Sequence, residues 1–382
     1  MLHSAFVEIH LGHLRHNLQR VQQYLGPATL VAVVKADAYG HGLVPVVRTL
    51  RDEGVRHFAV ARLREALMLR RHGIEDTLLL LGAPLPEELP SCAHHRIEVT
   101  VSSSMLAEAV CVTARRYGPL RVHVKVDTGM GRLGLWPDEV AAVIRKLERT
   151  PGITLVGLYT HLATAEHPDD PFMLEQLERF EQLWQQFGAT FEVQHVANSS
   201  ALFALPASYW TDSRQLARIG AALYGYLPRP GLSHQVGLRP AMRFVARVVQ
   251  VRTVSPGTSI SYGRTWVAPN WRRIAVVGAG YGDGIPRRLS NRGQVGLRGQ
   301  RFPIVGAICM DLTMVDLGDP ASAPDVQEGE PVIFFGEGGP LIEEMATWAE
   351  SVPYELSCSA ARRVPRHYQQ QPHPTQPTVE HR

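Results

Sequence analysis

Three consecutive segments, TLVGLYTH (154–161), FMLEQLERFEQLWQQFG (172–188) and FEVQHVAN (191–198), have the pattern of a strand, a helix and a strand. The two outer segments are apolar enough to be strands buried on both faces, and the middle one has the periodicity of an amphipathic helix that ends at a glycine. The same alternation recurs from about residue 29 to residue 220. We therefore expect eight strands, at TLVAVVK (29–35), HFAV (57–60), TLLLLG (77–82), IEVTV (97–101), LRVHVKVD (120–127), TLVGLYTH (154–161), FEVQHVAN (191–198) and QLARIG (215–220).

Eight successive β/α units favour an α/β fold with an N-terminal (β/α)8 TIM-type barrel, although a doubly wound sheet has the same local pattern. The segment LPRPGLSHQVGLRP (227–240) breaks the alternation with proline and glycine and marks a domain boundary. Beyond it, short strand-like pieces between glycine turns predict a mostly β C-terminal domain with one helix at LIEEMATWAE (341–350). We expect the barrel over residues 1–230, the β-rich domain over 231–367 and a disordered tail over 368–382.

The composition is that of a globular protein with two domains. Of the 382 residues, 45% are hydrophobic, and the net charge of +3 comes without a basic tract, so we expect no nucleic-acid partner. The four cysteines form no CxxC pair, which fits a reducing cytoplasm and predicts no structural zinc or other metal site. The N-terminus lacks the pattern of a signal peptide, and the apolar runs are only strand length. We therefore expect a cytoplasmic protein without membrane attachment.

Catalytic groups of a (β/α)8 barrel lie at the C-terminal ends of the strands. Lys35 closes the first apolar strand, where burial would lower the pKa of its amine and suit it to form a Schiff base. The alternative is a lysine whose charged end reaches out of the barrel mouth. The fifth strand carries Lys125 and leads to Arg132. Lys125 would be unfavourable beside Lys35 and Arg132 unless its charge were removed.

The last two strands of the barrel offer groups for a phosphate. In barrels, the loops after these strands frequently bind phosphate, and here they contain the Ser199 hydroxyl and the backbone near Gly220 and Ala221. A reactive amine together with a phosphate site points to pyridoxal phosphate as the cofactor. The alternative for Asn198 and Ser199 is an ordinary helix N-cap.

Arg218 lies in the eighth strand, and His161 and His195 end two neighbouring strands, so the three side chains could form one polar chain. A guanidinium beside the pyridine nitrogen of the cofactor would keep that nitrogen unprotonated and limit side reactions such as transamination. The alternatives are an arginine paired with a carboxylate and histidines with purely structural roles.

One glycine-rich motif suggests a different cofactor. The run IAVVGAGYGDG (274–284) resembles the start of a dinucleotide-binding motif. The pattern G-x-G-x-x-G fails in both registers, because Asp283 and Ile285 stand where the third glycine is required, and Pro286 follows where a helix should begin. A dehydrogenase is therefore disfavoured.

Motifs spread over almost the whole chain resemble those of the alanine racemases, fold-type III pyridoxal-phosphate enzymes. No single motif carries the resemblance, but their number and order do. The matching motifs are AVVKADAYGHG (32–42), VKVDTGMGRLG (124–134), GLYTHLATA (157–165), HVANSSA (195–201), ARIGAALYG (217–225), ISYGRTW (260–266), GYGDGIPR (280–287), VGAICMD (305–311) and PYELSC (353–358).

The resemblance implies a two-base mechanism in a homodimer with shared active sites. Lys35 would form the Schiff base with the cofactor and act as one base, and Tyr262 of the partner subunit would act as the other from the opposite face of the substrate. The chain through His161, Arg218 and His195 would make the Tyr262 phenol more acidic than a free tyrosine.

The resemblance also implies the binding residues. Arg132 and the backbone of Met310 would bind the substrate carboxylate, and Lys125 matches a lysine that is carbamylated in many relatives. The phosphate of pyridoxal phosphate would be held by Tyr39, Ser199, Tyr354 and the backbone at Gly220 and Ala221.

The activity implied is the interconversion of L- and D-alanine, which supplies D-alanine for bacterial peptidoglycan. A broad-specificity racemase of the same fold is an alternative, but such relatives are typically exported and this chain shows no signal peptide. A fold-type III decarboxylase would be expected to place an acid, not Arg218, at the pyridine nitrogen. A non-enzymatic pyridoxal-phosphate carrier would be a bare barrel without Tyr262 and Met310.

Overall fold

The structure, a computed structural model, describes residues 3–167, 169–229, 231–360 and 363–370. Its chain forms two compact units. The barrel unit consists of Leu18–Ala38 and Leu43–Leu223, and the β unit consists of Met1–Asn17, Tyr39–Gly42 and Tyr224–Arg382. None of the helices within the described ranges is both long enough and apolar enough to cross a bilayer.

The barrel unit contains one sheet of eight parallel strands in the order β8-β7-β6-β5-β4-β3-β2-β9. A parallel bridge between Gln194 and Gln215 brings the two end strands together, so the sheet is nearly closed. This arrangement confirms the (β/α)8 barrel and excludes the doubly wound sheet. All eight expected strands are present, as β2 (Thr29–Val33), β3 (His57–Val60), β4 (Thr77–Leu80), β5 (Glu98–Val101), β6 (Leu120–Lys125), β7 (Ile153–Tyr159), β8 (Val193–His195) and β9 (Leu216–Ile219).

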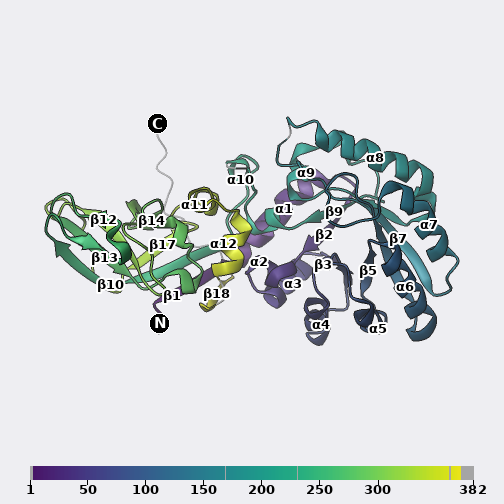
Figure 1. Ribbon diagram of the computed structural model, residues 1–382, viewed down its shortest axis with the longest axis horizontal. Coiled ribbons are helices and arrows are strands. Elements are labelled where there is room, and N and C mark those ends of the chain that lie inside the picture. The colour runs from purple at the N-terminus through teal and green to yellow at the C-terminus, as the bar shows by residue number, and fades with distance from the viewer. Residues whose placement is uncertain (1–2, 168, 230, 361–362, 371–382) are drawn as a thin grey trace. The chain divides into compact units, whose positions relative to one another are not determined.

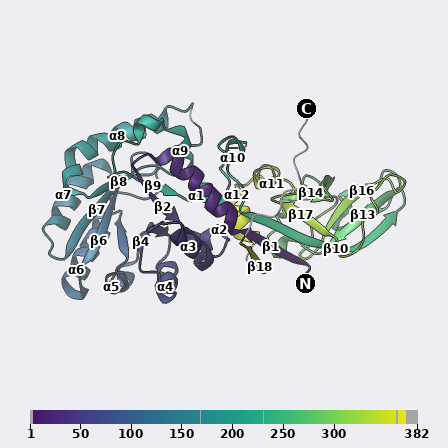
Figure 2. The same ribbon diagram turned by 180° about the vertical axis from the view of Figure 1, so that it is seen from behind.

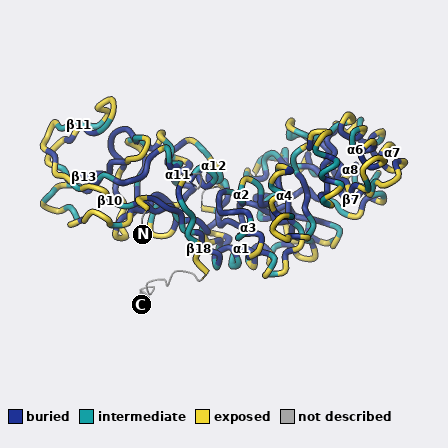
Figure 3. The backbone as a smooth tube through the Cα atoms, turned by 90° about the horizontal axis from the view of Figure 1, so that it is seen from below, coloured by how far each residue is buried: buried dark blue, intermediate teal, exposed yellow. Residues whose placement is uncertain are grey.

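Helices lie on the outside of the barrel strands (Figures 1 and 2). The helix α7 turns an apolar stripe inward, because Val140, Val143, Ile144 and Leu147 are buried at helical spacing. Figure 3 shows the resulting alternation of buried and exposed residues along the outer helices. The helices are α1 (Leu11–Leu25), α3 (Leu43–Asp52), α4 (Leu63–Arg71), α5 (Leu89–His94), α6 (Ser104–Tyr117), α7 (Pro137–Glu148), α8 (Phe172–Phe187) and α9 (Ser199–Ala204).

The β unit is built around the long strand β10 (Met242–Val254), which pairs antiparallel with β1 (Ala5–His10), β13 (Arg272–Val277) and β17 (Pro331–Phe335). It is mostly β, as expected. Its remaining elements are β11 (Ser259–Ile260), β12 (Trp266–Val267), β14 (Gln294–Leu297), β15 (Gln300–Pro303), β16 (Thr313–Gly318), β18 (Arg366–Gln369), α10 (Leu232–Gln235), α11 (Ile342–Ala349) and α12 (Pro353–Ala360).

The structure differs from the expected domain limits at both ends of the chain. Residues 1–17 group with the β unit instead of the barrel, because β1 (Ala5–His10) pairs antiparallel with β10 and parallel with β18. Tyr368 and Gln369, expected in a disordered tail over 368–382, belong to β18, where backbone pairing with β1 orders them. The remainder of that expected tail, residues 371–382, lies outside the described residues.

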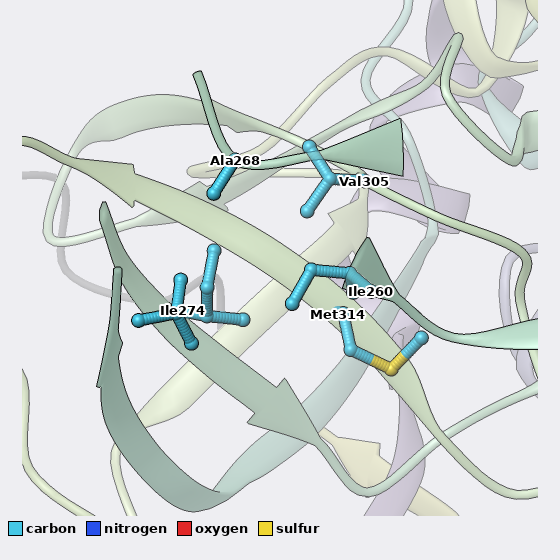
Figure 4. Close-up of a cluster of buried hydrophobic side chains, with 6 residues drawn as sticks. Ile260, Ala268, Ile274, Val305 and Met314 are labelled. Atoms are coloured by element: carbon cyan, nitrogen blue, oxygen red, sulfur yellow. The ribbon is translucent and has the colours of Figure 1, made fainter. Parts of the chain in front are cut away.

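One hydrophobic cluster of the β unit includes residues of the short hairpin β11–β12 and its neighbours. Figure 4 shows how the side chains of Ile260, Ala268, Ile274, Val305 and Met314 meet there. Trp266 and Cys309 pack against the cluster as partly buried neighbours. The cluster therefore anchors both ends of the segment that carries Tyr262.

Candidate active site

Lys35 lies two residues after the end of β2 and begins the short element α2 (Lys35–Tyr39), where it is half-buried. Residues 36–39 have φ angles of 53, 56, 53 and 55°, so α2 is a left-handed turn. Each such non-glycine residue costs roughly 1–2 kcal/mol. Two carboxylates hold the turn: Glu65 Oε1 accepts from the Ala36 N–H at 2.6 Å, and Asp37 Oδ1 accepts from the Leu43 N–H at 2.7 Å. Glu65 was not singled out in the sequence.

Arg218 is the centre of the polar chain expected at the strand ends, and the structure confirms this chain. Its guanidinium is buried. Nη1 lies 2.9 Å from His195 Nδ1, and Nη2 lies 3.2 Å from His161 Nδ1. The same nitrogens donate to the carbonyls of Thr160, His195 and Val196 at 2.7–3.0 Å. Among the described residues, the side chain of Arg218 hydrogen-bonds to histidine nitrogens and backbone carbonyls, so the alternative of a carboxylate partner is wrong.

The polar chain continues into the barrel interior through residues that the sequence reasoning missed. His195 Nε2 lies 2.9 Å from His123 Nδ1, and His123 Nε2 lies 2.8 Å from Glu98 Oε2. Arg121 Nε donates to Glu98 Oε1 at 2.7 Å. Gly157 makes room for this chain, because a Cβ there would lie 2.2 Å from His123 Nδ1.

The hydrogen-bond geometry determines the proton positions along this chain. An arginine can only donate, so His195 Nδ1 accepts and its proton sits on Nε2. His195 Nε2–H then donates to His123 Nδ1, and His123 Nε2–H donates to the Glu98 carboxylate. His161 likewise accepts from Arg218 at Nδ1. All three rings are therefore neutral when every bond in the chain is made.

Electrostatics agree with this assignment. Burial and the Arg218 charge hold the pKa values of His161 and His195 well below the usual value. Burial lowers the pKa of Arg218 to about 10, so it remains a cation at neutral pH. The hydrogen bonds from His123 and Arg121 outweigh the effect of burial on Glu98 and bring its pKa to about 2.

Lys125 is a buried amine beside two arginines. Burial, followed by the charges of Arg218 and Arg132, lowers its pKa to about 7. Its Nζ lies 5.4 Å from the centre of the Tyr159 ring, which stacks on His195 at 4.3 Å. A substantial fraction of Lys125 is therefore neutral at physiological pH, as its position between cations led us to expect.

Asp127 fixes the loop that carries Arg132. Its two carboxylate oxygens accept hydrogen bonds from the backbone N–H groups of Gly129, Gly131 and Arg132 at 2.9–3.1 Å. These bonds outweigh burial and lower the pKa of Asp127. The Arg132 side chain is exposed on this rigid loop and available to an anionic ligand.

The loops after β8 and β9 meet at Ser199. Its Oγ accepts from the backbone N–H of Gly220 at 3.0 Å and of Ala222 at 3.3 Å, next to Ala221. Asn198 is the N-cap of α9, and its side chain accepts from the Ala201 N–H at 2.9 Å. The helix-cap alternative is therefore correct for Asn198, and the Ser199 hydroxyl lies beside the backbone of residues 220–222.

The expected site residues divide between the two units. In the β unit, Tyr39 packs edge-on against Tyr354 with ring centres 6.3 Å apart, and burial raises the pKa of Tyr39. Tyr262 and Met310 are 72% and 53% exposed. The barrel unit holds Lys35, Lys125, Arg132, His161, His195, Ser199, Arg218, Gly220 and Ala221, and the β unit holds Tyr39, Tyr262, Met310 and Tyr354.

The sequence contains a pattern from which Arg121 and His123 could have been predicted as part of the polar chain. In LRVHVKVD (120–127), polar residues at 121, 123, 125 and 127 alternate with apolar ones. Alternating residues of a strand share one face, so Arg121 and His123 point the same way as Lys125. The alternation could have predicted a polar barrel interior, whereas the sequence reasoning considered the strand ends.

Comparison with known proteins covers both units. Residues 9–228 match the family profile "Alanine racemase, N-terminal domain", and residues 241–368 match "Alanine racemase, C-terminal domain". The chain is 40% identical to an alanine racemase of Nostoc sp. over 373 residues, 95% of each chain. It is 41% identical to an alanine racemase of Chlorobaculum tepidum over 367 residues, 94% of each chain.

Solved structures give the same result. A crystal structure of alanine racemase from Streptomyces lavendulae superposes with a TM-score of 0.90 at 33% identity, covering 97% of this chain and 98% of the other. That of the biosynthetic alanine racemase from Pseudomonas aeruginosa has a TM-score of 0.89 at 33% identity, covering 97% and 100%. Sequence and structure together establish that the chain belongs to the alanine racemase family of isomerases.

Proposed function

We propose that this chain interconverts L- and D-alanine with pyridoxal phosphate as cofactor, in the cytoplasm, and so supplies D-alanine for peptidoglycan. Membership of the alanine racemase family supports the reaction. The observation that carries the proposal is the buried Arg218 cation, held between neutral His161 and His195 in the same unit as Lys35.

The residues present fit pyridoxal phosphate. Among the described residues, the side-chain hydrogen bonds of Arg218 all use Nη1 and Nη2, which leaves its Nε–H for the unprotonated pyridine nitrogen. The Ser199 hydroxyl and the backbone at Gly220 and Ala221 would bind the phosphate, with the hydroxyls of Tyr39 and Tyr354. The Lys35 amine would hold the cofactor covalently. When bound, the cofactor withdraws electrons from the substrate Cα and makes its proton acidic.

Two proton-transferring groups on opposite faces of the substrate Cα suit racemisation, because one removes the proton and the other returns it from the other side. Lys35 Nζ would serve one face, and Tyr262 Oη of the partner subunit in a homodimer would serve the other. The exposure of Tyr262 supports this assignment, because 72% of a large aromatic residue is left uncovered by its own chain. His161 accepts from Arg218 at Nδ1, so its Nε2–H is the group that would donate to a tyrosinate and stabilise it.

Arg132 and the Met310 backbone N–H of the partner subunit would bind the substrate carboxylate. Lys125 would react through its neutral amine with carbon dioxide, forming a carbamate and releasing a proton. The pKa of about 7 supports this step, since only the unprotonated amine is a nucleophile. The resulting anion would lie near Arg132 and Arg218 and offset their charges.

The test combines cofactor spectra with racemisation measured by circular dichroism on a panel of amino acids. Lys35→Ala should abolish both the yellow colour and activity, whereas Lys146→Ala, a surface control paired with Glu108, should change neither. An unchanged spectrum in Lys35→Ala would overturn the cofactor assignment. Faster racemisation of several other amino acids than of alanine would favour the broad-specificity alternative.

The shared site can be tested by complementation between two inactive variants. Mixed Lys35→Ala and Tyr262→Phe protomers form heterodimers in which one site has both groups, so about a quarter of the wild-type activity should return after subunit exchange. Tyr117→Phe, at another exposed tyrosine, is the matched control and should remain active. No recovery in confirmed heterodimers would overturn the proposal that Tyr262 acts in the partner subunit's site.

A further inference from the structure

We infer that Asn291 is a positioning residue for the reaction: its side chain ties the segment that carries Tyr262 to the segment that carries Met310. This inference rests on the proposed function, in which Tyr262 exchanges a proton with the substrate. Asn291 follows the short helix at Arg287–Leu289 and has a φ angle of 59°. Asparagine is one of the few residue types that adopt this conformation readily.

The backbone around Tyr262 needs external support. Ser261, Gly263 and Arg264 have φ angles of 64, 71 and 49°. Two of these three are not glycine, and such conformations persist only where the surroundings enforce them. The Tyr262 side chain is 72% exposed, so packing against its own chain does little to fix it. Its position therefore depends on how its backbone is held.

The N-terminal side of this segment is held through residues 306 and 307. Ile260 lies in the hydrophobic cluster together with Val305 (Figure 4). Ser261 Oγ donates to the Ala307 carbonyl at 2.5 Å. Gly306 has a φ angle of 73°, and a Cβ there would lie 2.7 Å from the Ile260 carbonyl oxygen, so only glycine allows this approach.

The C-terminal side of the segment is held by Asn291. Its Nδ2 donates to Thr265 Oγ1 at 3.0 Å, and its Oδ1 accepts from the Gly306 N–H at 2.6 Å. The Asn291 amide thus joins Thr265 to Gly306. Together with the Ser261–Ala307 bond, it closes a ring of hydrogen bonds around the Tyr262 backbone.

The same ring reaches the segment of Met310. The Ile308 N–H donates to Ser290 Oγ at 2.9 Å, next to Asn291 in the chain. Beyond it, the Met310 carbonyl accepts from the Gly282 N–H at 2.8 Å. Asn291 and Ser290 therefore set the spacing between the proposed proton-transferring group and a proposed contact of the substrate carboxylate.

Asn291 and Thr265 are both exposed, so losing their hydrogen bond should affect catalysis more than folding. Small displacements of a catalytic group lower rates by factors near 100. Asn291→Gly removes the side chain and tolerates the positive φ angle. Asn291→Asp keeps two acceptor oxygens, which can receive the Gly306 N–H and the Thr265 hydroxyl. The first variant should disrupt positioning, and the second should restore it.

The experiment measures racemisation of L- and D-alanine, each with hydrogen or deuterium at Cα, in the full-length holoenzyme. Asn291→Gly should lower kcat by about 10- to 100-fold with KM changed less than about threefold. The deuterium isotope effect should rise for one enantiomer only, the one deprotonated by Tyr262. Asn291→Asp should stay within about threefold of wild-type kcat, and Thr258→Val, in a turn away from the ring, is the unaffected control.

An unchanged kcat in Asn291→Gly, or a lower kcat with isotope effects altered equally for both enantiomers, would overturn the inference. If Asn291→Gly does not fold, Thr265→Val decides the question: a fall in kcat with the same one-sided isotope effect supports the inference, and unchanged kinetics refute it. Tyr262→Phe separates the two levels. Full activity of Tyr262→Phe would overturn the proposed function. Loss of activity in Tyr262→Phe, together with unchanged kinetics in Asn291→Gly, would overturn only the inference.

Discussion

Removal of the Glu98 carboxylate is the perturbation that probes the polar chain most directly. Glu98 is buried at the far end of the chain from Arg218 and accepts from Arg121 Nε and His123 Nε2 at 2.7 and 2.8 Å. Glu98→Ala leaves both donors without this acceptor. Glu98→Gln has only one acceptor oxygen, so either Arg121 or His123 loses its bond.

The magnitude follows from the pKa of Glu98. Its value of about 2 in the folded protein lies below the 4.5 of an unperturbed glutamate. At 1.36 kcal/mol for each pKa unit, this difference corresponds to at most about 3 kcal/mol of stability at neutral pH, because part of it is attraction to a protonated His123, which the hydrogen-bond chain holds neutral. The folded pKa is lowered, so the contribution is complete above pH 4.5 and is lost as the pH falls toward 2. Glu98→Gln, which loses one charged hydrogen bond, should cost about 1.5–3 kcal/mol.

Thermal unfolding followed by calorimetry measures this effect. A domain of this size loses roughly 2–4 °C in Tm per kcal/mol, so Glu98→Ala should lower Tm by up to about 6–12 °C at pH 7. The difference from wild type should shrink as the pH falls from 4.5 toward 2. Glu108→Ala is the matched control, because Glu108 lies on the surface, where it pairs with Lys146. A shift for Glu98→Ala as small as that of the control would refute a stabilising chain through Glu98.

Three further perturbations test other parts of the barrel unit. Arg218→Glu should raise pyruvate formed by transamination relative to racemisation, because an acid would protonate the pyridine nitrogen; equal partitioning in variant and wild type would refute this role. Ala36→Gly relieves the strain of a left-handed φ angle of 53° at an exposed position, a gain of roughly 1–2 kcal/mol. The greater conformational entropy of glycine in the unfolded chain offsets about 0.4–1 kcal/mol of this gain, so Tm should rise by a few degrees. A lower Tm would contradict the strain argument. Lys125→Met should raise Tm most below pH 7 in CO2-free buffer, and this advantage should fade toward pH 10.5. The pKa of Lys125 is about 7 in the folded protein and 10.5 in the unfolded chain, so the stability of the wild type increases between these two pH values. A pH-independent difference in Tm would contradict the lowered pKa.

The barrel was predictable from the sequence because each of its strands is buried on both faces. Such strands read as short apolar runs, and helices with one apolar stripe separate them, so β2 to β9 were found within a few residues of their limits. The strand β1 was not found. Its partners begin more than 200 residues further along the chain, as in the pair Ala5 and Ala246, and local periodicity carries no information on such pairing.

The candidate site was predicted where it follows from strand ends. His161, Arg218 and His195 were expected to meet because the ends of neighbouring parallel strands converge. Glu98 and His123 were missed because they lie deeper in the strands, and Glu65 because it acts from a helix through backbone contacts. Which hydrogen bonds these side chains make depends on side-chain geometry that the strand pattern does not contain.

The alternation of strands and helices and the residue types at the ends of the barrel strands could be predicted from the sequence alone, because these depend on local hydrophobic pattern and turn chemistry. Only the tertiary structure decided that β1 and β18 complete the C-terminal sheet, and that Arg218 and Glu98 are linked through two neutral histidines. It also placed Asn291 between the segments of Tyr262 and Met310. These features are contacts between distant residues, whose free energy arises only when folding brings their atoms within hydrogen-bonding distance.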